Sequence, residues 1–391
     1  MPIASNTAFR FTGFEEFWRE YWTITGVAGG QPVLGSQITG FTGANACPSP
    51  LLAGSAPAGT VACVVTGDGS ARPSDTQVAS DLEATQEDEW IIGINHQFNE
   101  RWSFGVSLTH RELVTTAEDV AVDAAVLNYC AANAIANCSS TWTGFHQYVV
   151  VNPGSSATFA LAGLDGRTVT FTAEELGYPE AERTYDALEF TFRRERQEGD
   201  RWDIAGSYTL SESRGNTEGF VNSDFDQDDA GITQGFDQPG LVDGANGRLP
   251  NDRTHRIKLW GSYDITEAFS IGSQVQISSP RPLSCFGLHP TDPFANAYGA
   301  ASHFCDGVLI QRGTASESDW LYNVDLSFRY NIDVAGGLTL RADVFNVFDS
   351  HGVNARNELG DLAAGGPNPN YDQPTGYQPP RSVRLGLDIR F

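Results

Sequence analysis

The sequence predicts an all-β protein, an antiparallel transmembrane β-barrel with long loops at one end. The first observation is a strict alternation of apolar and polar residues, clearest in the last ten residues. There, one face of the expected strand is apolar and the other polar: Val383, Leu385, Leu387, Ile389 and Phe391 against Ser382, Arg384, Gly386, Asp388 and Arg390. This pattern suits a strand that lies between lipid and water.

The same alternation recurs earlier in the chain and brings the number of expected strands to nine. These segments are about as long as a tilted strand needs to cross a bilayer, roughly 9–11 residues. Short turns join them in pairs at 99–100, 198–200, 266–267 and 333–337. The expected strands lie at 90–98, 102–108, 188–192, 202–210, 257–263, 269–277, 322–330, 338–344 and 382–391.

The second observation is that short turns alternate with long loops along the whole chain. In bacterial outer-membrane barrels the short turns are periplasmic and the long loops extracellular. A soluble β-sandwich is the alternative, but its loops rarely reach the length of segment 213–253. Residues 6–14 are a candidate tenth strand, which would give an even number, and 14–22 could instead form a short helix.

Composition narrows the function classes. The chain has 49 acidic and 24 basic side chains and a formal net charge of -25, which argues against a nucleic-acid partner because phosphate binding needs a basic surface. No window holds the roughly 18 apolar residues of a membrane helix. We expect residues 1–86 to hold a first strand or lead-in with an extracellular loop, and 87–391 to hold the barrel strands and loops.

Several segments resemble a known family. Segment 340–349 (LRADVFNVFD), followed by a last strand ending in Arg390 and Phe391, resembles the carboxy-terminal signature of TonB-dependent outer-membrane receptors. The order of the similar segments, and their placement on expected loops and strands, make the combined match more specific than any single motif. Segments similar to the Oar-like branch lie at 226–233, 236–240, 249–256, 289–292 and 367–371.

The resemblance implies a barrel of about 22 strands with a plug domain inside, energised by the TonB complex, for uptake or export of an unidentified substrate. This sequence shows no export signal, plug or TonB box ahead of its strands, so we expect the carboxy-terminal half of such a barrel. Implied partners are the outer membrane, the plug and remaining strands, the TonB complex through the missing part, and the barrel-assembly machinery through the last strand and Phe391.

In this arrangement the polar strand positions line the lumen, where they would contact the plug or a passing substrate. Ion pairs between neighbouring strands are the alternative use of these side chains. The expected lumen-facing residues are Arg256, Lys258, Asp325, Arg329, Arg341, Asp343, Arg384 and Asp388.

We expect no enzyme and no cofactor, because the seven histidines show no grouping typical of a catalytic site. One alternative is a self-closed small barrel that acts as an omptin-like surface protease, with Asp228 and Asp229 beside His255 or His289. Another is an adhesin that works through its loops. Loop aromatics either contact a ligand or hold the loops together: Phe220, Phe225, Phe236, Phe286, Tyr298, Tyr371 and Tyr377.

The six cysteines form three local pairs, each within one expected extracellular loop, which predicts disulfides in an oxidising compartment. Zinc is the alternative, but the spacings do not match its usual ligand patterns. The pairs are Cys47 with Cys63, Cys130 with Cys138, and Cys285 with Cys305.

One acidic loop is a candidate cation site. Asp224, Asp226 and Asp228 occupy alternate positions, a spacing that can present oxygen ligands to Ca²⁺. The segment lacks the glycine and glutamate of an EF-hand loop. A solvated acidic loop is the alternative.

Overall fold

The computed structural model describes residues 15–28, 31–37, 61–71, 74–225, 227, 230–333 and 337–389, which fall into two units, 1–78 and 79–391. In the first unit, β1 (Glu15–Ala28) pairs with both β2 (Gln31–Gln37) and β3 (Val61–Ala71) in an antiparallel sheet. A helix is therefore wrong for 15–22, because these residues belong to β1 and pair with β3. The candidate strand at 6–14 lies outside the described residues.

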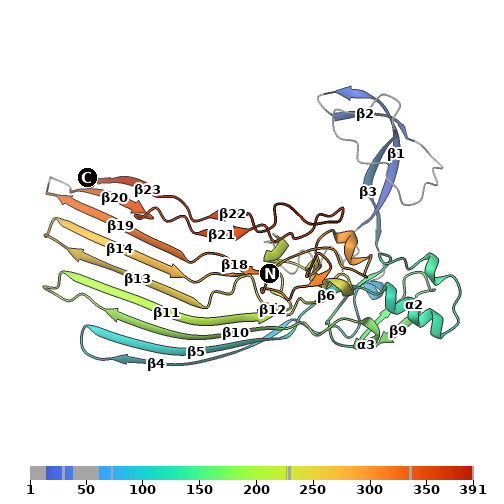
Figure 1. Cartoon of the computed structure of the whole chain (residues 1–391), viewed down its shortest axis with the longest axis horizontal. Helices are drawn as coiled ribbons and strands as arrows, with labels where there is room; N and C mark the ends of the chain where they lie inside the picture. The colour runs from blue at the N-terminus through green and yellow to red at the C-terminus, as the bar shows by residue number, and fades with distance from the viewer. Residues whose placement is uncertain are drawn as a thin grey trace. The chain divides into compact units, whose positions relative to one another are not determined.

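The second unit is built on one antiparallel sheet whose main path has nine strands, as Figure 1 shows. All nine expected segments are strands, and neighbours along this path follow the chain order. From one edge to the other they are β4 (Gln86–Gln97), β5 (Trp102–Thr115), β10 (Arg183–Arg194), β11 (Trp202–Gly215), β13 (His255–Asp264), β14 (Phe269–Ser278), β19 (Leu321–Ile332), β20 (Leu338–Phe345) and β23 (Ser382–Ile389).

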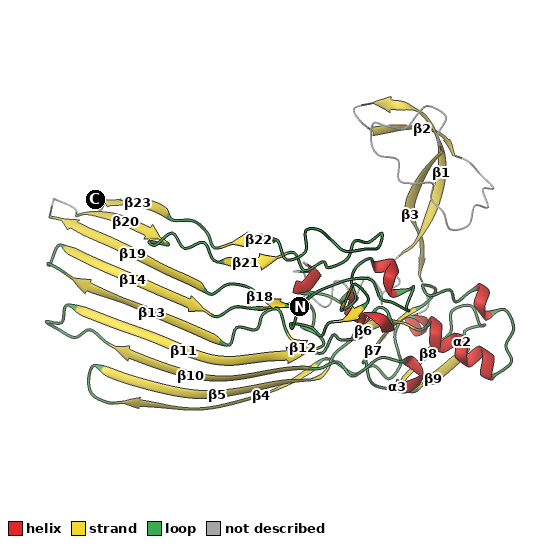
Figure 2. Cartoon of the chain, viewed as in Figure 1, coloured by secondary structure: helices red, strands yellow, loops and turns green. Residues whose placement is uncertain are grey.

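The sheet has tight turns at one end and long loops at the other. In the turn between β10 and β11, Gly199 adopts a φ of 85°, which favours glycine. The helices lie at the loop end (Figure 2). They are α2 (Asp123–Ala132) and α3 (Ala173–Leu176), with 3-10 turns at 74–76, 138–140, 223–225, 234–236, 239–241 and 295–298.

The loops carry short strands of their own, and no helix in the described ranges combines the length and apolarity needed to span a bilayer. The loop strands are β6 (Glu118–Ala121), β7 (Tyr148–Val151), β8 (Ala157–Ala160), β9 (Thr168–Phe171), β12 (Gly247–Arg248), β15 (Pro282–Leu283), β16 (Phe304–Cys305), β17 (Val308–Leu309), β18 (Ser316–Glu317), β21 (Val353–Arg356) and β22 (Pro374–Tyr377).

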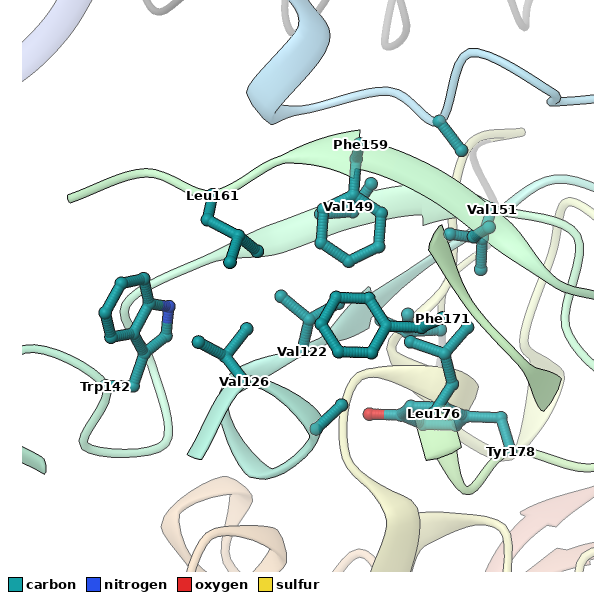
Figure 3. Close-up of a cluster of buried hydrophobic side chains, with 14 of the residues drawn as sticks. Val122, Val126, Trp142, Val149, Val151, Phe159, Leu161, Phe171, Leu176 and Tyr178 are labelled. Atoms are coloured by element: carbon teal, nitrogen blue, oxygen red, sulfur yellow. The ribbon is translucent and has the colours of Figure 1, made fainter. Parts of the chain in front are cut away.

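The loop between β5 and β10 is folded around a hydrophobic core, which sequence reasoning did not foresee. Phe159 and Phe171 stack with ring centroids 5.3 Å apart, and Trp142 is buried at the same core. Figure 3 shows these rings converging with the valines of the neighbouring strands. Thr172 caps α3 and forms a reciprocal capping box with Glu175. This loop is thus a small folded body.

The two faces of the nine-stranded sheet differ as the alternation predicts. Large apolar side chains stand exposed along one face, and Ile92, Leu108 and Leu188 are neighbours across β4, β5 and β10. Such exposure is costly in water and natural in lipid. Exposed members of this face include Trp90, Ile92, Ile94, Val106, Leu108, Phe190, Tyr263, Tyr322, Leu340, Val383, Leu385, Leu387 and Ile389.

Candidate functional site

The strand register places all eight expected lumen-facing residues on the same, polar face of the sheet. Asp343 lies opposite Arg384 and accepts hydrogen bonds from it at 2.8 and 3.0 Å. Arg341 and Asp388 form a second ion pair at 3.0 Å. These four residues therefore make the strand-to-strand ion pairs considered above. That this face borders the lumen stays a prediction.

The other four lumen candidates are not in ion pairs within the described part of the chain. Arg329 lies directly opposite Arg341, so two guanidinium groups are neighbours on this face. Arg256 donates to the backbone oxygen of Asn251 at 3.2 Å. Lys258 occupies the same cross-strand row as Gln276. The cationic side chains thus remain available for a plug or a substrate.

A polar cleft with a volume of about 530 Å³ lies where this face meets the loop that leads into β23. It contains Asp325 from the expected set together with side chains that the sequence did not single out as a site. The polar cleft is lined by Gln276, Ser278, Leu321, Asn323, Asp325, Phe345, Asn346, Asn354, Tyr377, Gln378, Pro379, Pro380 and Ser382.

Two amide side chains fix the loop wall of the polar cleft. Asn346, which adopts a φ of 48°, donates from Nδ2 to the backbone oxygens of Ser350 and Pro379 at 3.0 and 2.9 Å. Gln378 donates from Nε2 to the backbone oxygen of Tyr322 at 3.0 Å. These bonds join the chain before β23 to the rest of the sheet, so the cleft has a defined shape.

Other groups in the polar cleft keep hydrogen-bonding capacity. Asp325 Oδ1 accepts from Asn323 Nδ2 and from the backbone N–H of Asn346, both at 2.9 Å. The Gln276 amide makes no hydrogen bond within the described residues, and Asn354 uses only its oxygen, which accepts from Arg253. The alternation of Gln274 and Gln276 with apolar residues in β14 was the sequence signal that could have found this wall.

A larger cavity of about 750 Å³ lies among the long loops. His289 Nε2 contacts Asp243 Oδ2 there at 3.0 Å, and Asp292 Oδ2 accepts from the backbone N–H of Gly240. Glu174 and Glu180 also line it, so the cavity is acidic. Its histidine and aspartates serve loop structure through these bonds.

The acidic segment predicted to hold Ca²⁺ is only partly described. The carboxylate of Asp224 is buried and pairs with Arg312 at 2.5 Å, and Glu218 lies 4.0 Å from the same guanidinium. Asp226 and Asp228 lie outside the described residues. Within the described part, no group of three or more potential ligands could hold a metal ion. The calcium site stays a prediction.

Buried ionisable side chains connect the long loops to one another. Burial raises the pKa of Glu218 above its ordinary value, and it raises that of Glu358, which pairs with Arg281 at 2.8 Å. Burial also lowers the pKa of His303 to about 3, with a further contribution from Arg312. His303 is therefore neutral at physiological pH.

Several loop aromatics hold the loops together. The rings of Phe225 and Phe286 pack in a tilted arrangement with centroids 4.7 Å apart, and Phe236 is buried in the core of the first large loop. The Tyr298 hydroxyl donates to Asp237 at 2.7 Å, and burial is the first cause that raises the pKa of Tyr298. Tyr377, in contrast, is exposed and lines the polar cleft.

The cysteines agree with the expected local pairing where they are described. Cys130–Cys138 closes a separation of 8 residues and Cys285–Cys305 one of 20. Cys47, and with it the third pair, lies outside the described residues, as does Phe391. His255, proposed for the protease alternative, contacts the Tyr208 hydroxyl at 2.9 Å and stacks on Trp320, while Asp228 and Asp229 lie outside the described part.

Comparison with known proteins supports the resemblance. The chain is 26% identical over 357 residues to the TonB-dependent transporter Oar of Myxococcus xanthus, covering 81% of this chain and 29% of that protein. The chain therefore spans less than a third of the length of this curated relative. No family model matches. The resemblance to TonB-dependent outer-membrane receptors of the Oar-like branch is confirmed, and the chain is an outer-membrane β-barrel portion.

Solved outer-membrane receptors are similar at low identity. The Escherichia coli outer membrane transporter YddB matches with a TM-score of 0.44 and 12% identity, covering 80% of this chain and 33% of that one. The ferripyoverdine receptor of Pseudomonas aeruginosa matches with a TM-score of 0.43 and 12% identity, covering 82% and 29%. The ferric-catecholate import receptor Fiu of E. coli matches with 0.42 and 13%, covering 95% and 40%.

Proposed function

We propose that the chain supplies the carboxy-terminal barrel wall and the extracellular ligand-contacting loops of a TonB-dependent outer-membrane transporter, for uptake or export of a substrate. The observation that carries this proposal is the nine-stranded sheet, with an exposed apolar face, a charged face and all long loops at one end. Its relative is described as a transporter and not as an enzyme. A non-enzymatic role is consistent with that.

The two edges of the sheet support further barrel strands as partners. Within the described residues, β4 and β23 each pair with one neighbour, so each leaves a row of backbone groups without a strand partner. In hydrocarbon an unsatisfied backbone group costs several kcal/mol. The remaining strands of a larger barrel would pair with these edges. A plug would meet the charged face, and the TonB complex would act through that plug.

Refolding tests this proposal directly. The chain is refolded in detergent alone, or together with a polypeptide that contains the plug and preceding strands of the complete receptor. Gel mobility is then compared before and after boiling, and strands are counted by cryo-electron microscopy. We expect a compact, heat-sensitive species only in the mixture. A closed ring formed by this chain alone would instead support the self-closed small barrel.

A further inference from the structure

We propose that the polar cleft binds a single-chain anionic amphiphile, with the anionic head at β13 and the acyl chain towards β23. This inference rests on the proposed function, because it takes the charged face of the sheet as the face that meets a substrate. It adds the chemical class of that substrate. Three features carry it: cations without acidic partners on one side of the cleft, apolar side chains on the other, and a fixed carboxylate between them.

Two exposed cationic side chains of β13 border the cleft. Lys258 lies directly opposite Gln276 of β14. Arg256 lies directly opposite Ser278, and both β14 residues line the cleft. Neither cation is in an ion pair within the described residues, although Arg256 donates to the backbone oxygen of Asn251. An anionic head beside them accepts charge-assisted hydrogen bonds, which are stronger than bonds between neutral groups.

A third cation lies on the same side of the cleft. Arg253 donates at 2.9 Å to Oδ1 of Asn354, which lines the cleft. Burial lowers the pKa of Arg253, and the nearby Arg256 and Arg281 lower it further. Arg281 pairs with Glu358, whereas Arg253 and Arg256 have no acidic partner in the described part of the chain. Because neighbouring like charges repel each other, this side of the cleft favours an anion.

The side of the cleft towards β23 is apolar. It is formed by Phe345 of β20 and by three residues of the chain before β23, namely Tyr377, Pro379 and Pro380. Tyr377 is 57% exposed, and both prolines are exposed. Leu321 of β19 lies opposite Ser278 and connects this wall to the cationic side. Three strand spacings, about 14 Å in all, separate β13 from β20. An extended acyl chain of medium length covers that distance and removes its methylene groups from water.

Asp325 sets the direction of the ligand. It lies in β19, between the cations and the apolar wall, and it is the one charged side chain among the residues that line the cleft. Its Oδ1 accepts hydrogen bonds from Asn323 Nδ2 and from the backbone N–H of Asn346, both at 2.9 Å. This carboxylate repels an anionic head towards β13, so the acyl chain extends towards β20 and β23.

Other ligand classes use only part of this arrangement. A hydrophilic anion leaves the apolar wall in water, a neutral amphiphile leaves the cations without a partner, and a cationic amphiphile is repelled by them. The cleft volume of about 530 Å³ lies within the roughly 300–1,000 Å³ typical of small-molecule sites. A single acyl chain with a carboxylate or sulfate head meets all these conditions.

Isothermal titration tests the inference. The chain, refolded with the completing polypeptide where refolding requires it, is placed in phosphatidylcholine nanodiscs, and the signal of empty nanodiscs is subtracted. The probes are decanoate, decyl sulfate, decyltrimethylammonium and acetate. We expect decanoate or decyl sulfate to bind, the tighter of the two identifying the head group, and the other two probes not to bind.

Variants separate the head from the chain. Lys258→Gln and Arg256→Gln should each weaken binding at least fivefold, whereas Lys258→Arg, which keeps the charge, should bind as the wild type does. Tyr377→Ala should weaken decanoate more than hexanoate, since only the longer chain reaches this ring. Arg193→Gln is the matched control and should leave binding unchanged, because Arg193 is an exposed arginine on the same face of the sheet, in β10, which β11 separates from β13.

The inference is overturned if the folded barrel binds neither anion, if decyltrimethylammonium binds as tightly as the anions, or if binding survives both Lys258→Gln and Arg256→Gln. In each of these cases the completed barrel leaves the proposed function standing. Failure to form that barrel would count against the proposed function itself, and the inference would fall with it.

Discussion

Glu118 is a fully buried carboxyl group in the first large loop, with Thr233 as its partner. Its oxygens accept from the backbone N–H and the hydroxyl of Thr233 at 2.9 and 3.1 Å. Burial raises the pKa of Glu118 well above its ordinary value, and the nearby Asp119 and Asp237 raise it further. Glu118 therefore contributes stability that is fully present below pH about 4.5 and is lost as pH rises through the raised pKa.

Glu118→Gln should remove this dependence, because a carboxamide can accept from the N–H and donate to the hydroxyl of Thr233. We expect the variant to have a melting temperature at or above the wild type at pH 8 and a shallower slope between pH 4.5 and 8. Differential scanning calorimetry measures both, with the exposed Glu174→Gln as control. A variant destabilised equally at every pH would show that ionised Glu118 is needed.

Arg312 is the cation on which two buried acids depend. It is 4% exposed, and its guanidinium contacts Asp224 and approaches Glu218. Arg312→Ala would leave both carboxylates without this cation, which for a buried pair costs about 3–5 kcal/mol. We expect faster proteolysis of loop 279–320. Arg214→Ala, which breaks an exposed pair with Glu212, should cost no more than about 1 kcal/mol. Equal effects would contradict the buried pairing.

Among the elements, the disulfides should contribute according to the length of the loop they close. In the chain-entropy model, closing 8 residues stabilises by about 2.5 kcal/mol and closing 20 by about 3.3 kcal/mol. Replacing Cys285 and Cys305 by Ser should therefore lower loop stability slightly more than replacing Cys130 and Cys138. Hydrogen exchange of the two loops gives the comparison. A reversed order would mean that packing, such as the core around Cys130, outweighs chain entropy.

The barrel strands were predictable and the loop elements were not, for a physical reason. A strand between lipid and water must alternate apolar and polar residues, so segments such as 269–277 can be recognised in the sequence. Segment 116–182 folds around a core whose partners are far apart in the sequence: Trp142 and Phe159 lie 17 residues apart in this loop, Phe236 comes from the loop between β11 and β13, and the three share no short period. Likewise the polar cleft joins Gln276 to Tyr377, and only the fold brings these residues together.

For the molecule as a whole, the central question is which face of the sheet meets lipid, and adjacent residues of β4 can answer it. Ile94 belongs to the apolar face and is 70% exposed, whereas Asn95 belongs to the polar face. A lysine near the bilayer midplane costs about 2–4 kcal/mol on the lipid side and little on the lumen side.

In lipid vesicles that also hold the polypeptide with the plug and preceding strands, Ile94→Lys should therefore reduce the amount of folded, heat-modifiable protein, while Asn95→Lys should leave it close to the wild type. The two variants add the same charge at adjacent positions of the same strand, so the change in net charge cancels in the comparison. The opposite result would place the charged face against lipid. The lumen would then not be bordered by Arg256, Lys258 and Arg329. The polar cleft would not lie on any route that a substrate could take.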